Sequence, residues 1–237
     1  VWHLKENPVG TAANMTDSAL FFSNGTSGGS MTSGDQVAGK IDGSLDFDGS
    51  DDYINFGKAG VLSLGSTGTL SAWVKFINAT PNKYAYIVGK SKGGNAATTV
   101  YGISHDPGSN KFFLWISNGT TQETSSTSTT SWTVGIWYYF TGVWNGVGLP
   151  MRMYVNGSPD GSANTQTLSV WADSTQNVSI GCGFGIPVCG GADDAINATV
   201  DEVRISAVNR SADWIKTEYR NQANPALFHY NMTQETC

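Results

Sequence analysis

Apolar and polar residues alternate with a period of two along most of the chain, which is typical of strands that bury one face. The segment TLSAWVKF (69–76) is representative, because every second residue from Leu70 to Phe76 is apolar. Similar runs end in Gly, Asn, Ser or Pro, as turns require, and they cover residues 84–90, 111–117, 151–157 and 177–183. The pattern predicts a protein built mainly of short β-strands.

Two segments depart from simple alternation. WYYFTGVWN (137–145) is apolar on both faces, so we expect a central strand that is covered on both sides, which requires two packed sheets. TTQETSSTSTTS (120–131) has no apolar residue and predicts an exposed hairpin or loop. Asn156-Gly157 suits a type I′ hairpin turn, because both residues tolerate a positive φ.

One helix is expected, over residues 211–222. Ser211 can cap it, Trp214, Ile215 and Tyr219 form an apolar stripe at helical spacing, and Asn224-Pro225 ends it. The preceding ATVDEVRIS is a strand. Since no linker, repeat or change in composition divides the chain, residues 1–237 are predicted to form a single all-β domain, a sandwich with one short C-terminal helix.

Composition and charge narrow the class of partner. The chain carries 13 basic and 19 acidic residues, a net charge of -6, and its basic residues form no cluster, which excludes a nucleic acid as a partner. No run approaches the ~18 apolar residues of a membrane span. The aromatic content of 11% is too high for a disordered chain. We therefore expect a folded domain without a membrane span.

Several features favour an extracellular or cell-surface location. The chain starts at Val1 without an initiator Met or a charged-then-apolar leader, which we interpret as a processed, secreted chain. The signal Asn-X-Ser/Thr occurs nine times. Asn156 is discounted because it lies in a tight turn and Pro159 follows its signal. The expected N-glycan acceptors are Asn14, Asn24, Asn78, Asn118, Asn177, Asn197, Asn209 and Asn231.

The three cysteines leave alternatives open. Cys182 and Cys189 bracket the short loop GFGIPV and can close a small disulfide in an oxidising compartment; otherwise they are two free, buried thiols. Cys237 is the odd one, so it is free, bonded to another chain, or paired with a cysteine outside this sequence.

Taken together, several motifs resemble a known family. GSLDFDGSDDYINFG (43–57), TLSAWVKF, WYYFTGVW, MYVNG, and TVDEVRIS with its helix look like the laminin-G-like members of the concanavalin A-like lectin/glucanase superfamily, in the form found in bacterial and archaeal surface proteins. VWHLKENP (residues 1–8) looks like that family's first strand. The resemblance implies a jelly roll of two curved antiparallel sheets. It also implies binding of glycans, proteins or calcium far more often than catalysis.

The aspartates around residue 50 need an explanation, because a carboxylate taken out of water must be compensated. Asp201 shares a face with Val203 and Ile205 if alternation holds, and it then accepts backbone N–H bonds from a nearby turn, such as Gly49-Ser50. The second interpretation is a structural Ca²⁺ site formed by Asp48, Asp51, Asp52 and Asp201, since Ca²⁺ binds six to eight oxygens. The same alternation places Glu202 and Arg204 together on the opposite face, where they can pair.

Catalysis is not expected. Glycosidases need two neighbouring carboxylates, and no two of the five glutamates lie within one predicted strand. Aromatic rings can also stack on sugars. For most tryptophans burial in the core is the simpler role, but Trp132 and Trp171 flank polar loops and are the candidates for carbohydrate stacking.

Two functions remain. The first is a non-catalytic structural or adhesive module, a glycosylated subunit of an extracellular filament, whose partners are like subunits. A polar stretch (7–39) follows residues 1–8, so this strand either folds back on its own sheet or completes a neighbour's sheet by exchange. The alternative is a lectin-like carbohydrate-binding module, with or without Ca²⁺, whose partners are surface glycans or glycoproteins.

Overall fold

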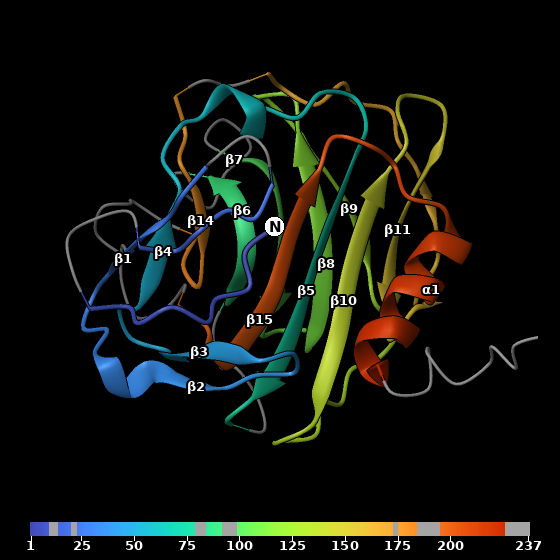
Figure 1. Ribbon diagram of the computed structural model, residues 1–237. Coiled ribbons are helices and arrows are strands. Elements are labelled where there is room, and N and C mark those ends of the chain that lie inside the picture. The colour runs from blue at the N-terminus through green and yellow to red at the C-terminus, as the bar shows by residue number, and fades with distance from the viewer. Residues whose placement is uncertain are drawn as a thin grey trace, which may run out of the picture.

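Two antiparallel sheets pack face to face, and one α-helix lies outside them (Figure 1). The structure is a computed structural model that describes residues 1–9, 14–19, 23–78, 84–91, 99–172, 175–183 and 195–225. The all-β sandwich expected from the alternation is confirmed, as is the jelly-roll class. Within these ranges, no helix has the length and apolar character needed to cross a bilayer.

The first sheet has seven strands, and all neighbouring strands run antiparallel. Its order across the sheet is β1 (Thr26–Gly28), β4 (Tyr53–Asn55), β14 (Val178–Ile180), β6 (Tyr86–Ser91), β7 (Thr99–Asp106), β8 (Lys111–Ser117) and β9 (Gln122–Ser126).

The second sheet has eight strands. Its order is β12 (Ser158–Pro159), β11 (Pro150–Val155), β10 (Trp137–Trp144), β5 (Gly68–Phe76), β15 (Asn197–Ser206), β3 (Gly43–Asp48) and β2 (Gln36–Ala38), and β13 (Asn164–Thr165) pairs with β11. Two short 3-10 helices, Ser33–Asp35 and Gly60–Leu62, lie in the connections.

The core fills the space between the sheets. The alternating residues of β5 from Leu70 to Phe76 all join it, and Phe76 stacks on Phe112 of the opposite sheet with ring centroids 5.5 Å apart. Gly142 on β10 leaves room for Leu114, since a Cβ there would lie 2.9 Å from that side chain. Burial of each such large apolar side chain contributes roughly 1.5–3 kcal/mol, so this interior is the main source of stability.

β10 lies between β11 and β5, as its double-sided apolar pattern predicts. One face of the strand joins the core through Phe140 and Trp144. The other face of the strand is turned toward the helix. On this face Tyr139 lies beside Trp73 of β5, with ring centroids 5.1 Å apart.

The helix α1 (Ala212–Ala223) confirms the prediction of residues 211–222 to within one residue. The Ser211 side chain accepts a hydrogen bond from the Trp214 backbone N–H, which satisfies one of the free donors at the helix start. The face that α1 buries is mixed, with Ile215, Glu218 and Gln222 turned toward the sheet. In Figure 1, α1 lies on the outer side of the eight-stranded sheet, beside β10 and β11.

Residues 1–8 do not form the regular strand expected of them. They make isolated bridges at Trp2, to Val203 of β15 and to Asp17, and Leu4 has a φ of 53° that turns the chain away from an extended path. Trp2 and Leu4 are nevertheless buried, and the Trp2 ring packs on Phe56 at a centroid distance of 4.2 Å. This segment therefore contributes to the core of its own chain.

Candidate functional site

Three of the predicted calcium ligands lie together in the loop between β3 and β4. The carboxylate oxygens of Asp48, Asp51 and Asp52 are all within 4.8 Å of one another. Hydrogen bonds hold them in place: the Asp48 N–H donates to Asp52 Oδ2 at 3.0 Å, and the Ser30 hydroxyl donates to Asp51 Oδ1 at 2.7 Å. We name Asp48, Asp51 and Asp52 the loop triad.

The loop triad contains like charges in close proximity, which is electrostatically costly. The pKa of Asp52 is raised to about 6, mainly by burial and also by the neighbouring carboxylates of Asp48 and Asp51, while the hydrogen bond from the Asp48 N–H lowers it. A bound cation would remove this repulsion. Three carboxylates, with waters to complete the shell, suit a hard divalent cation such as Ca²⁺.

The fourth predicted ligand, Asp201, does not join the loop triad. Asn197 at the start of β15 pairs with Asp48, and Asp201 lies four residues further along, roughly 13 Å of extended chain away. Its Oδ2 accepts the backbone N–H groups of Lys40 and Ile41 at 2.7 and 2.9 Å. A turn therefore does hold Asp201, but it is the turn before β3 and not Gly49-Ser50.

The predicted orientation of Asp201 is also wrong, for a physical reason. β15 carries a bulge between Asp201 and Arg204, and Glu202 within it has a φ of 50°. A bulge adds one residue to a strand and breaks the alternation of its faces. Asp201 consequently pairs with Trp73 on the outer face, away from the core that Val203 occupies.

The outer face beside the bulge holds a buried ionic network. Arg204 bridges two carboxylates, with Nη2 2.8 Å from Glu202 Oε2 and Nη1 2.7 Å from Glu218 Oε1. Tyr139 donates its hydroxyl hydrogen to Glu218 Oε2 at 2.6 Å, and His3 Nδ1 contacts Glu202 Oε1. The predicted pairing of Glu202 with Arg204 is confirmed. We name these five residues the Arg204 network.

Electrostatics explains why the Arg204 network is charged although it is buried. Burial alone disfavours the Arg204 cation, yet Glu218 and Glu202 raise its pKa above the ordinary value. Burial raises the pKa of Glu218, and Arg204 partly reverses that effect. Such a group of charges is stable only while every partner is present.

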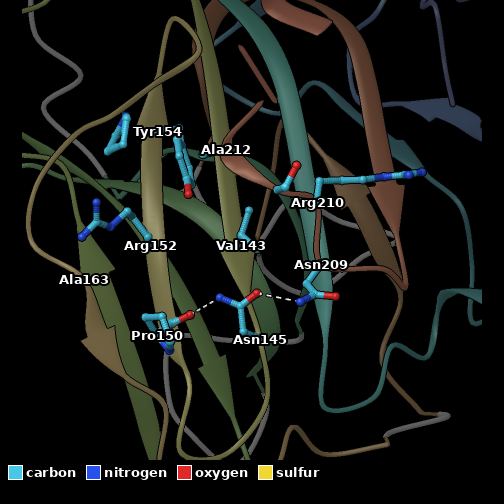
Figure 2. A pocket seen from close by; sticks show the side chains of 11 residues that line it. Val143, Asn145, Pro150, Arg152, Tyr154, Ala163, Asn209, Arg210 and Ala212 are labelled. Carbon is cyan, nitrogen blue, oxygen red and sulfur yellow. Dashed lines mark hydrogen bonds between the residues drawn. The ribbon is translucent and has the colours of Figure 1, made fainter. Parts of the chain in front are cut away.

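A pocket of about 400 Å³ lies nearby on the same outer face, between β10, β11 and the start of α1 (Figure 2). Asn145 occupies its middle: its amide donates to the Pro150 carbonyl, and its Oδ1 accepts from Asn209 Nδ2 at 3.0 Å. In the described part of the chain, no acidic side chain lines this pocket; the lining residues are Val143, Asn145, Pro150, Arg152, Tyr154, Pro159, Ala163, Asn209, Arg210, Ser211 and Ala212. We name it the asparagine pocket.

The two tryptophans expected to stack on sugars differ from the prediction and from each other. Trp132 is only 3% exposed and packs among Phe76, Phe112 and Phe140, so its candidacy was wrong. Its indole is large enough to enter the core even from a polar loop. Trp171 is half-buried and packs against the core and beside Gly119.

The predicted glycan acceptors fall into two groups. Asn24, Asn78, Asn118 and Asn209 are exposed, whereas Asn14, Asn177 and Asn197 are half-buried, and Asn231 lies outside the described residues. Asn197 is engaged, because its Nδ2 donates to the Asp48 carbonyl at 2.9 Å.

Of the cysteines, Cys182 is buried and disulfide-bonded. Its expected partner Cys189 lies outside the described residues, so that pairing stays a prediction. Cys237 also lies outside them.

Sequence reasoning missed the asparagine pocket and the partners of Arg204. The hairpin of residues 137–155 carries a weak signal for the pocket. Most of its residues are apolar, but Arg152 and Tyr154 occupy outward-facing positions. Glu218 gave no such signal, since it meets Arg204 only after the helix docks.

Comparison with known proteins defines the fold. The family model described as the concanavalin A-like lectin/glucanases superfamily matches residues 48–216. No curated protein matches the chain.

Among solved structures, the chain is similar to domain 4 of AbnA, a GH43 extracellular arabinanase from Geobacillus stearothermophilus, in complex with arabinotriose. The TM-score is 0.65 at 16% identity, over 91% of this chain and 97% of that chain. The binding domain of botulinum neurotoxin serotype D gives a TM-score of 0.60 at 13% identity, over 93% of this chain and 52% of that chain.

A Trypanosoma rangeli sialidase mutant displaying trans-sialidase activity gives a TM-score of 0.53 at 20% identity, over 76% of this chain and 28% of that chain. At these identities the three likenesses show the fold alone. That fold is shared by enzymes and by binding domains.

Proposed function

Because this chain belongs to the concanavalin A-like lectin/glucanases superfamily, we propose that it is a non-catalytic carbohydrate-binding module of an adhesive, extracellular protein. The ligand would bind in the asparagine pocket (Figure 2). The similar domain of AbnA in complex with arabinotriose supports a glycan as the ligand class.

The lining of the asparagine pocket is the observation that carries this proposal. The amides of Asn145 and Asn209 and the guanidinium of Arg152 offer donors and acceptors to sugar hydroxyls. The half-buried Tyr154 offers a ring face to the C–H groups of a sugar. A volume of about 400 Å³ lies within the usual range for small-ligand sites.

The same lining supports binding without catalysis. Glycosidases need an acid and a second carboxylate beside the scissile bond, and no Asp, Glu, His or Cys is among the described residues that line the asparagine pocket. The carboxylates of Glu202 and Glu218 are already paired with Arg204.

A glycan array followed by titration calorimetry tests the proposal, with arabinotriose as the first soluble probe. We expect Tyr154→Ala to weaken binding at least tenfold, because it removes the ring face. Lys58→Ala, an exposed change outside the pocket, is the matched control and should bind like the wild type. Absence of binding to every glycan and to arabinotriose would contradict the proposal.

We also propose that Ca²⁺ binds the loop triad and stabilises the loop between β3 and β4. The ion would be structural, because the described residues beside it include no nucleophile placed for catalysis. The raised pKa of Asp52 supports this, since a divalent cation compensates the charge that burial disfavours.

N-glycosylation is proposed for the exposed acceptors, and Asn209 connects it to binding. Asn209 lines the asparagine pocket, so a glycan attached there would cover the site. Mass spectrometry of protein from a glycosylating host would locate the sugars. If Asn209 carries one, protein from a host that does not glycosylate should bind a soluble glycan more tightly than the glycosylated protein. Equal binding by the two preparations would show that a glycan on Asn209 does not cover the pocket.

A second candidate, proposed on a separate observation, is a filament subunit that exchanges residues 1–8 with a neighbour. Trp2 and Leu4 are buried side chains on a segment that pairs with β15 through an isolated bridge at Trp2 and through the contact of His3 with Glu202. The same contacts form between two copies if the segment is exchanged. Electron microscopy would show filaments that Trp2→Ala abolishes; monodisperse particles at high protein concentration would exclude this assembly.

A further inference from the structure

A second cavity lies along α1, on the side of the helix that faces β15. Its volume is about 330 Å³, and its lining consists of Arg204, Trp214, Thr217, Glu218, Asn221 and Gln222. Four of these residues lie three or four positions apart and so share one face of the helix: Trp214, Thr217, Glu218 and Asn221. We name this cavity the helix pocket.

The helix pocket contains polar atoms whose hydrogen-bonding capacity is not used by the protein. Arg204 Nε and Asn221 Oδ1 are buried without a hydrogen-bond partner, whereas Glu218 Oε1 lies 2.7 Å from Arg204 Nη1. Glu218 is only 7% exposed. A buried polar group without a partner costs about 1–3 kcal/mol, so these atoms indicate a ligand that supplies the missing bonds.

The chemistry of these atoms restricts the ligand to one class. One donor and one acceptor without a partner lie in the pocket that the Trp214 indole also lines, and a hydroxyl group can serve either kind, because it both donates and accepts. An anion would be repelled by Glu218, and a cation by Arg204. The ligand that fits is a neutral, polyhydroxylated ring, with its C–H face on the indole.

The two pockets meet at one contact. Arg210 lines the asparagine pocket, and its Cζ lies 4.3 Å from the centroid of Trp214, which lines the helix pocket. Figure 2 shows the Arg210 side chain extending away from Arg152 and out of the asparagine pocket. The stacked Arg210 and Trp214 side chains therefore form the border between the two cavities.

We propose that the helix pocket is a second sugar subsite, and that one neutral oligosaccharide occupies both pockets across the Arg210 and Trp214 stack. This inference rests on the proposed function and specifies its ligand. Binding energy then grows with chain length, because a single sugar unit fills only one pocket.

Titration calorimetry with neutral oligosaccharides of one to five units, in arabinose, xylose and glucose series, tests this subsite. We expect affinity in at least one series to rise tenfold or more between one unit and the longest chain. Asn221→Ala should lower the affinity of the longer chains three- to tenfold, as loss of one hydrogen bond does, and leave single-unit binding unchanged. Tyr154→Ala should weaken all lengths.

Lys216→Ala, an exposed change on α1, is the matched control, and thermal melts confirm that each variant folds. If sugars bind but affinity does not depend on length, or if Asn221→Ala binds long chains like the wild type, the helix pocket is no subsite and the proposed function stands. If no series binds the wild type while the glycan array finds another ligand, this inference fails and the proposed function stands. If the array is silent as well, both fail.

Discussion

The loop triad and the Arg204 network are two acidic regions that compensate their charge in opposite ways. The triad lies where the chain passes from β3 of the eight-stranded sheet to β4 of the seven-stranded sheet, and the network lies on the outer face of the eight-stranded sheet. The triad places three carboxylates within 4.8 Å of one another, two of them exposed, and no basic side chain contacts them among the described residues. The network buries two carboxylates, and each has a cationic or hydroxyl partner within 3 Å.

The difference distinguishes two roles that a buried or crowded aspartate or glutamate can have. Where the protein supplies its own counter-charge, the acid is structural and holds α1 and residues 1–8 to the sheet. Where it does not, as in the loop triad, the partner that we propose is an external cation. Three experiments sharpen this contrast, in order of decreasing expected effect.

Arg204→Met should produce the largest change. It removes the shared cation and leaves Glu202 and Glu218 buried without compensation, which costs about 3–5 kcal/mol in the free energy of unfolding at pH 7. Urea unfolding measures this loss. Arg152→Met changes an arginine on the same outer face that forms no ion pair within the described part of the chain, and should cost less than about 1 kcal/mol. Equal losses of unfolding free energy in the two variants would show that the Arg204 network has no special role in stability.

Calcium should stabilise the loop triad by an intermediate amount. At a free Ca²⁺ concentration of 100 times its dissociation constant, the gain is about 2.7 kcal/mol. Thermal melts in Ca²⁺ and in chelator measure it, and Asp51→Asn should abolish the difference. Asp201→Asn should retain it, because Asp201 lies outside the triad; a lost calcium effect in that variant would restore the four-ligand site.

Asp201→Asn should instead change how stability depends on pH. Burial raises the pKa of Asp201 to about 7 from its ordinary value of 3.8, against the N–H of Ile41. Between these values the unfolded chain has lost the proton and the folded chain keeps it, so the free energy of unfolding falls as pH rises from 4 to 7.

The slope that Asp201 contributes is at most about 1.4 kcal/mol per pH unit. Urea unfolding across this range should therefore give a flatter curve for Asp201→Asn. The exposed variant Asp42→Asn is the control for the same turn, and its curve should follow the wild type. Parallel curves for all three proteins would show that Asp201 ionises freely.

Much of the fold could be predicted from local patterns. The alternation in β5 and the capped stripe of α1 depend on residues close in sequence, and both elements end within one residue of the expected position. The structure of the polar run 120–131 was harder to predict. It does form a hairpin with β8, but β9 is an edge strand whose Ser125 is buried although it is polar.

The candidate site could be predicted only in part, because it depends on local breaks and distant contacts. The loop triad was accessible, since its three residues are neighbours in sequence. Asp201 was misplaced because a bulge leaves no signal in an otherwise regular strand. Trp132 was misplaced because its partners, such as Phe112 and Phe140, come from other strands.

The bulge at Glu202 has one more consequence, for attempts to engineer this scaffold. A side chain at a φ of 50° strains the backbone by roughly 1–2 kcal/mol, and glycine is the usual remedy. Here glycine would also delete the carboxylate that Arg204 and His3 contact. Relaxing the main chain at this residue and keeping its electrostatics are incompatible aims, so routine glycine substitution should destabilise the domain.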